Sequence, residues 1–161
     1  MLPVFRSFLF LGTSVVALSC SSSSSPAPAC AAYTTSIDLT TPMVSMKTDV
    51  QPIIDRSCTF SSCHGTGSGK VTMVQNDSSM TRMALVGVDA PELPGTKLVA
   101  PGDPGNSWLM KKLDGDVCLF ASKCVTIDGN CGDTMPQNGD LLDVSERDKF
   151  RRWIAQGAND N

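Results

Sequence analysis

Two cysteines and a histidine stand within seven residues near the middle of the chain: Cys58, Cys63 and His64. His64 is also the only histidine in the protein. Thiols that precede an imidazole in this way are typical of covalent haem attachment, for which the usual spacing is Cys-x-x-Cys-His. In that chemistry the two thiols bind the haem vinyl groups and the imidazole binds the iron. Four residues separate the cysteines here, so the segment predicts one covalent haem c held through a widened motif.

A closed electron-transfer haem needs a second axial ligand, which is commonly a methionine thioether or another imidazole. Because the chain has no second histidine, we expect a methionine. Met80, Met83 and Met110 stand at helical spacing and are predicted to fill the core. Met135 instead lies in a polar, irregular loop and is followed by a proline, which restricts the backbone. Met135 is therefore the predicted axial partner of His64.

Residues 1–19 are predicted to be an export signal. They carry one positive charge, Arg6, before an apolar run from Phe8 to Leu18. The run is shorter than the about 20 residues that a transmembrane helix requires. It ends in Ala-Leu-Ser-Cys, which resembles a bacterial lipobox and predicts lipidation of Cys20. The alternative is ordinary cleavage nearby, which would leave Cys20 as an unpaired thiol.

A Ser- and Pro-rich segment follows Cys20, and we expect residues 20–44 to form a tether and residues 45–161 to form one domain. An anchored tether places the domain on the periplasmic side of a bacterial membrane. The serine after Cys20 favours sorting to the outer membrane. The net charge of −3, which becomes −4 when Arg6 leaves with the signal, and the lack of a basic stripe argue against nucleic-acid binding.

The remaining four cysteines, Cys30, Cys118, Cys124 and Cys131, are expected to form disulfides because exported proteins meet an oxidising environment. Four cysteines allow three pairings. The last three cluster in the sequence, so at least one bridge is expected among them, and the sequence does not select the pairing.

Four helices are predicted around a long cysteine-bearing loop at residues 114–140. The first spans 49–57 with Asp49 as its cap, and the second spans 77–85. A third follows a cap at Asn106 or Ser107. The fourth begins with Ser145 as cap and Asp148 completing a capping box, and ends at Gly157. The expected buried residues of the first and last helices are Val50, Ile53, Ile54, Phe150, Trp153 and Ile154.

Several short pieces of the chain occur together in a fixed order over about 110 residues. They are Val50-Gln51-Pro52-Ile53-Ile54, the segment from Cys58 to Gly65, Leu85-Val86-Gly87-Val88, Pro101-Gly102-Asp103-Pro104 with Ser107-Trp108-Leu109, Met135-Pro136, and Trp153-Ile154-Ala155-Gln156-Gly157-Ala158. In these pieces the chain resembles a bacterial class I cytochrome c domain. The widened cysteine spacing and the cysteine-rich insert before Met135 depart from the family pattern.

The resemblance implies an all-α fold in which the N- and C-terminal helices pack together and the haem lies between them and the methionine loop. It implies an electron carrier rather than an enzyme, with redox proteins as partners. It also implies that a backbone carbonyl near Pro101 holds the His64 ring. The expected apolar surround of the haem is Val50, Ile54, Leu109, Phe150 and Trp153.

Three other interpretations compete with this one. In a haem-free, disulfide-stapled structural lipoprotein, Cys58 and Cys63 would form a disulfide. In a zinc site, Cys63 and His64 would be joined by two of the cysteines between residues 118 and 131. A haem enzyme would need an open iron position, which requires Met135 to be absent from the iron.

Overall fold

The structure, a computed structural model, describes residues 30–65, 69–125 and 131–161. The described residues form helices and loops and no β-strand, and isolated β-bridges join single residue pairs. None of the helices in this part of the chain is long and apolar enough to cross a membrane. The expected signal, Cys20 and the first part of the tether lie outside the described residues. In chain order the elements are η1 (Met46–Val50), α1 (Gln51–Ser57), α2 (Ser78–Leu85), η2 (Pro104–Asn106), α3 (Trp108–Asp114), η3 (Asp116–Phe120) and α4 (Val144–Ala155).

The first helix begins three residues earlier than expected, because the π-helical η1 leads directly into α1. Ser45 is the cap, and its hydroxyl accepts a hydrogen bond from the Thr48 N–H at 3.1 Å. The Asp49 carboxylate in turn accepts from the Ser45 N–H at 2.9 Å, so Asp49 supports the cap and does not start the helix. The apolar face is buried as predicted, with one further residue at its start: Met46, Val50, Ile53 and Ile54.

Helix α2 has the expected position, but its buried face differs from the prediction. Asp77 caps the helix by accepting from the Met80 N–H at 2.9 Å. Thr81 and Leu85 are buried, whereas the Met80 and Met83 side chains are 49% and 65% exposed. The expectation that these two methionines fill the core is wrong, because the face at positions 81 and 85 already fills it.

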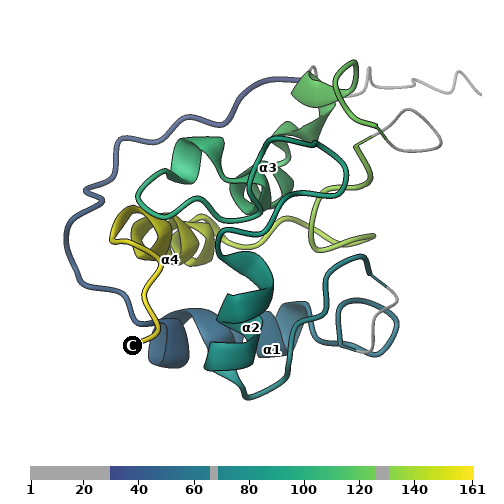
Figure 1. Ribbon diagram of the computed structural model, residues 1–161. Coiled ribbons are helices and arrows are strands. Elements are labelled where there is room, and N and C mark those ends of the chain that lie inside the picture. The colour runs from purple at the N-terminus through teal and green to yellow at the C-terminus, as the bar shows by residue number, and fades with distance from the viewer. Residues whose placement is uncertain (1–29, 66–68, 126–130) are drawn as a thin grey trace, which may run out of the picture.

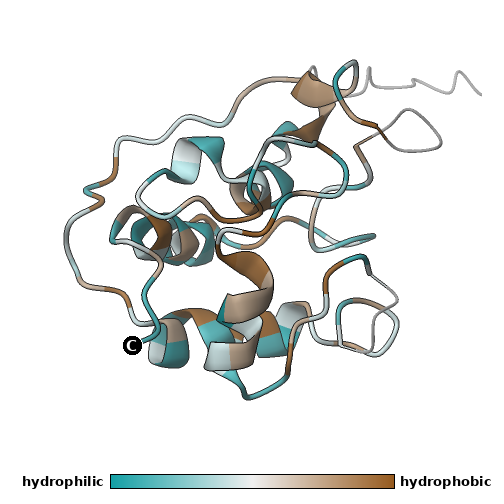
Figure 2. Cartoon of the chain, in the orientation of Figure 1, coloured by the Kyte–Doolittle hydropathy of each residue, from teal (hydrophilic) through white to brown (hydrophobic). Residues whose placement is uncertain are grey.

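Helix α4 begins at Val144 with Asp143 as cap, so the expected cap at Ser145 is wrong. Asp148 does not complete a capping box either; it accepts a hydrogen bond from Arg151 at 2.8 Å. The predicted stripe of Phe150, Trp153 and Ile154 is buried. The ribbon of α4 carries both hydrophobic and hydrophilic stretches, as expected for a helix with one face in the core (Figure 2).

A buried charge cluster joins α3 to α4. The Asp114 carboxylate at the end of α3 binds Arg147 at 2.8 Å and Arg151 at 2.5 Å, and the three side chains are each 7% exposed. The Tyr33 ring covers the cluster, with its centroid 4.5 Å from the Arg147 guanidinium and 5.0 Å from that of Arg151. The two helices are therefore coupled through one carboxylate as well as through apolar contact.

Residues 30–44, which we call the strap, pack on the folded body, whereas the sequence predicts them to be part of the tether. Cys30 forms a disulfide with Cys118, and the Tyr33 N–H donates to Asp116 at 2.8 Å. Further along, the Gln156 amide donates to the carbonyls of Leu39, Thr40 and Pro42 at 3.0–3.3 Å. Figure 1 shows the strap running around α4 from η3 to η1.

The C-terminal residue, Asn161, meets the start of η1. The Lys47 N–H donates to the Asn161 carbonyl at 3.1 Å, and the Met46 N–H donates to the Asn161 side chain at 3.0 Å. Helix α4 also contacts η1 directly. The first and last helical elements therefore pack against each other, which is the arrangement that the resemblance implied for this part of the fold.

Candidate functional site

The segment from Cys58 to His64 folds as a tight turn at the end of α1. The Cys58 N–H still bonds to the Ile54 carbonyl, so this thiol leaves directly from the helix. The Cys63 N–H donates to the Phe60 carbonyl at 2.9 Å, and the His64 N–H returns to the Cys58 carbonyl at 3.0 Å. The two extra residues of the widened motif are thus taken up by the turn, and His64 is brought back beside the first cysteine.

The His64 ring is held by a backbone carbonyl. Its Nδ1 lies 2.8 Å from the Val71 carbonyl oxygen, which can only accept, so Nδ1 carries the proton. The other nitrogen, Nε2, then has the free lone pair that a metal-binding imidazole needs. The expectation that the Pro101 region supplies this carbonyl is wrong, because the acceptor comes from the segment that follows His64 closely in the sequence.

Gly69 allows the backbone to pass directly beside the His64 ring. A Cβ atom at this position would lie 2.5 Å from Nδ1 and 2.7 Å from Cε1. The Gly69 N–H also donates to the Cys63 carbonyl at 2.7 Å. Gly65 also contacts the turn, because its N–H donates to the Phe60 carbonyl at 3.1 Å.

One cavity of about 240 Å³ brings the predicted residues together: Cys58, Cys63, His64 and Met135 all line it. The thiols and the imidazole come from the turn after α1, and the thioether comes from the loop that precedes α4. His64 and Met135 are 71 residues apart in the sequence, so only the fold brings them to the same cavity. The apolar part of the lining consists mainly of Phe60, Val71, Met73, Leu85, Leu98, Trp108, Leu109 and Leu113.

The apolar surround differs from the expected one. Of the five residues predicted, only Leu109 lines the cavity. Val50, Ile54, Phe150 and Trp153 are buried in the core. The predicted buried faces of the first and last helices are correct, but burial in a core does not distinguish residues behind the cavity wall from those that form it.

Met135 is held by α3. Its N–H donates to the Lys112 carbonyl at 3.0 Å, and its partly buried side chain packs against the core. A second methionine, Met73, is 5% exposed and also lines the cavity. The Met73 N–H bonds to the His64 carbonyl, so this residue is fixed beside the histidine, whereas Met135 approaches from a different element.

Cys58 and Cys63 are unpaired in the structure, while the other four described cysteines form two disulfides, Cys30–Cys118 and Cys124–Cys131. Burial, and then the nearby Cys63 thiol, raises the pKa of Cys58 to about 12, so it is a neutral thiol at pH 7.

This bonding differs from the bonding that two of the alternative interpretations expect. The structural lipoprotein required a Cys58–Cys63 disulfide. The zinc site required thiolates from cysteines that are bridged here, and disulfide sulfurs do not act as thiolate ligands.

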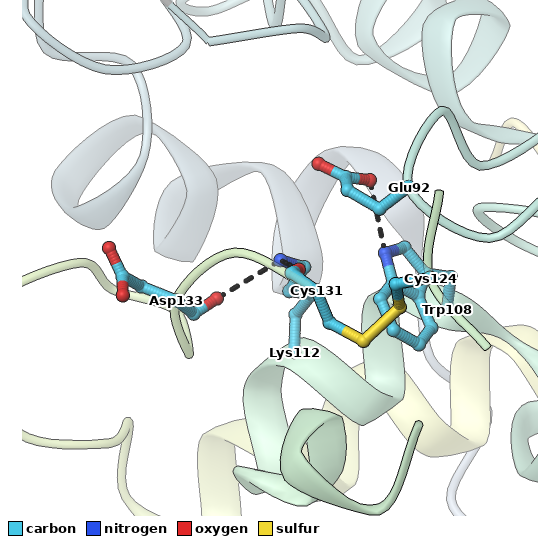
Figure 3. Close-up of a disulfide and its surroundings, with 6 residues drawn as sticks. All are labelled: Glu92, Trp108, Lys112, Cys124, Cys131 and Asp133. Atoms are coloured by element: carbon cyan, nitrogen blue, oxygen red, sulfur yellow. Dashed lines mark hydrogen bonds between the residues drawn. A yellow bond between two sulfur atoms is a disulfide. The ribbon is translucent and has the colours of Figure 1, made fainter. Parts of the chain in front are cut away.

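The charged residues of the cavity were missed by sequence reasoning. Lys70, Glu92 and Lys112 line it. Glu92 accepts a hydrogen bond from the Trp108 indole at 3.2 Å, and the Lys112 ammonium lies 5.5 Å from the Trp108 ring centroid (Figure 3). Burial lowers the pKa of Lys112. Hydrophobic periodicity does not identify such residues, because a buried lysine in a helix cannot be told from an exposed one by its sequence position.

Comparison of the chain with protein-family models, with curated proteins and with solved structures found no match. The assignment of a function therefore depends on the residues and on the geometry of this cavity.

Proposed function

We propose that this protein is an exported monohaem c-type cytochrome, similar to the class I family, that carries electrons and is not an enzyme. Cys58 and Cys63 would hold one haem c through thioether bonds. His64 and Met135 would be the axial ligands of its iron. The observation that supports this most strongly is that two unpaired thiols, an imidazole with a free Nε2 and a thioether from a distant loop line one largely apolar cavity.

The residues fit such a group in three respects. The Val71 carbonyl keeps the proton on His64 Nδ1, which leaves Nε2 for the iron. The largely apolar lining would limit the contact of a haem with water and would favour its less charged, reduced state. A bound haem would supply the one-electron couple of its iron, and ligands on both sides of it would leave no open position for a substrate. A haem enzyme would need Met135 to be displaced from this cavity.

Anchoring and location follow from the N-terminal sequence and remain part of the proposal. Lipidation of Cys20 would attach the protein to the periplasmic side of a bacterial membrane, with the outer membrane favoured by the serine that follows. The partners would be redox proteins reached from that membrane.

Covalent haem is tested on a denaturing gel. The full chain is produced in the periplasm of a host with c-type maturation machinery and stained for haem peroxidase activity. We expect a stain that survives denaturation in the parent and is lost in the Cys58→Ala/Cys63→Ala variant. Ser62→Ala lies in the same turn and should keep the stain, which controls for damage to the turn. A colourless parent, both from this host and from its native source, would refute the proposal.

The axial methionine is tested by comparing Met135→Leu with Met73→Leu. Both replace a cavity-lining thioether by an apolar side chain of similar size. We expect Met135→Leu alone to abolish the weak red absorption band of thioether-ligated ferric haem, and to lower the reduction potential. If Met73→Leu abolishes the band and Met135→Leu does not, the axial assignment is wrong.

A further inference from the structure

Lys112 buries an ammonium group against the backbone of the loop that carries Met135. The residue is 7% exposed, and its Nζ donates to the Cys131 carbonyl at 2.5 Å and to the Asp133 carbonyl at 3.1 Å (Figure 3). These acceptors are neutral carbonyls and not carboxylates. Glu92 and Asp133 favour its charged form, but no carboxylate is among its hydrogen-bond acceptors. Because burying a charge is costly, the two hydrogen bonds to the loop must offset part of that cost.

The same residue also holds the loop through its main chain. The Lys112 carbonyl accepts the Met135 N–H at 3.0 Å. The side chain of Lys112 thus fixes positions 131 and 133, and its backbone fixes position 135. The Cys124–Cys131 disulfide adds a covalent restraint at the beginning of this loop.

Gly132 makes the close approach of the ammonium possible. Its φ is +68°, and a Cβ atom there would lie 3.0 Å from Lys112 Nζ. A side chain would therefore be strained in this backbone conformation and would crowd the ammonium.

We propose that Lys112 is the positioning residue that holds the loop of residues 131–135 on the cavity wall, so that the Met135 thioether reaches the axial position. This role rests on the proposed function, because it concerns the iron that Met135 would bind. Lys112 itself does not touch the iron. Its effect is to keep a weak, neutral ligand in place by restricting the loop that carries it.

The test replaces the ammonium and keeps the apolar stem, in the full-length protein as purified. Lys112→Met removes both charge-assisted hydrogen bonds but leaves the backbone acceptor of Met135 intact. We expect amide hydrogen exchange at residues 131–135 to become about 10- to 100-fold faster, as for the loss of hydrogen bonds to a charged group. The red thioether band should weaken in the same sample.

Lys111→Met is the matched control, because this neighbouring lysine points to Asp116 at 3.9 Å and does not contact the loop. It should leave both the exchange rates and the band unchanged. Gly132→Ala keeps the charge but crowds it, and should reproduce the faster exchange. It provides a second variant if Lys112→Met does not fold.

The two readouts separate this proposal from the proposed function. Unchanged exchange in both Lys112→Met and Gly132→Ala would overturn the positioning role, whether or not the protein holds haem. Faster exchange with an intact red band would also overturn it. A parent without haem would refute the cytochrome assignment, and the exchange rates would then decide alone whether Lys112 holds the loop.

Discussion

His64 depends on its immediate backbone more than on distant parts of the fold. The carbonyl of Val71 holds its ring and Gly69 passes beside it, so both contacts come from the seven residues that follow the histidine. Such outer contacts set the orientation and the tautomer of a metal-binding imidazole. The widened cysteine spacing therefore does not leave the histidine loosely held, because the chain after it supplies the restraint.

Gly69→Ala should disturb His64 without changing any ligand. The added Cβ would lie 2.5 Å from Nδ1, closer than such atoms can approach, so the ring must move or lose its bond to Val71. Losing an outer-shell contact of this kind typically weakens metal binding or activity about 10- to 100-fold. With the proposed haem bound, we would expect a clear fall in the low-spin, six-coordinate fraction in the visible spectrum.

Gly105→Ala is the control for this substitution. A Cβ there would meet only the Asp103 carboxylate, at an ordinary contact distance of 3.5 Å. Its spectrum should match that of the parent. If both variants retain a parental spectrum, the close contact at Gly69 does not restrain the ring.

At the level of the elements, the sequence predicts which segments are helical better than it predicts where they begin and which face is buried. The stripe of α4 is long and regular, so Phe150 and Trp153 are found buried as expected. In α2 two faces compete over only eight residues, and Thr81 takes the position expected for Met80. Several residues near a helix start are suitable as caps by type alone. Ser45 is the cap because it bonds to Thr48 and Asp49, and only the fold defines these contacts.

For the candidate site, too, some features can be predicted from the sequence and others cannot. Cysteine, histidine and methionine are recognisable from their types and spacing. The Val71 carbonyl and the Lys112 ammonium could not be predicted, because neither the backbone path after His64 nor the buried side of a lysine is encoded in a local pattern.

The buried carboxylate between α3 and α4 should contribute far more stability than an exposed one. Asp114→Asn leaves Arg147 and Arg151 buried with too little negative charge, and we expect a loss of about 3–5 kcal/mol in the free energy of unfolding. Denaturant unfolding of the full-length protein measures this. Asp89→Asn removes an exposed ion pair with Lys97 and should cost less than about 1 kcal/mol. Equal losses in the two variants would show that the buried cluster does not couple the helices.

For the whole molecule, the two disulfides differ in how much of the chain they enclose. Cys30–Cys118 spans 88 residues and Cys124–Cys131 spans 7. If the disulfides act mainly by restricting the unfolded chain, removing the first as Cys30→Ala/Cys118→Ala should cost about 4–5 kcal/mol. Removing the second as Cys124→Ala/Cys131→Ala should cost about 2–3 kcal/mol.

Denaturant unfolding of the two double variants compares them directly, in samples that are matched in haem content if the proposed haem is present. The order of the two losses matters more than their size, because strain in the folded state changes each value. A larger loss from the short-range bridge would mean that Cys124–Cys131 stabilises the folded loop itself and that the long-range bridge adds little to the strap.

Because the strap is fixed to the body, it also limits how far the domain can lie from a membrane anchor at Cys20. With Cys20 anchored as proposed and Cys30 crosslinked to the body, ten residue steps connect lipid to domain. Fully extended, they span about 35 Å, whereas a body beginning at Ser45 would allow about 85 Å. A reach of 35 Å keeps the domain within a thin layer above the bilayer. For an anchored protein, encounters with partners in or on the same membrane would then become a search in two dimensions.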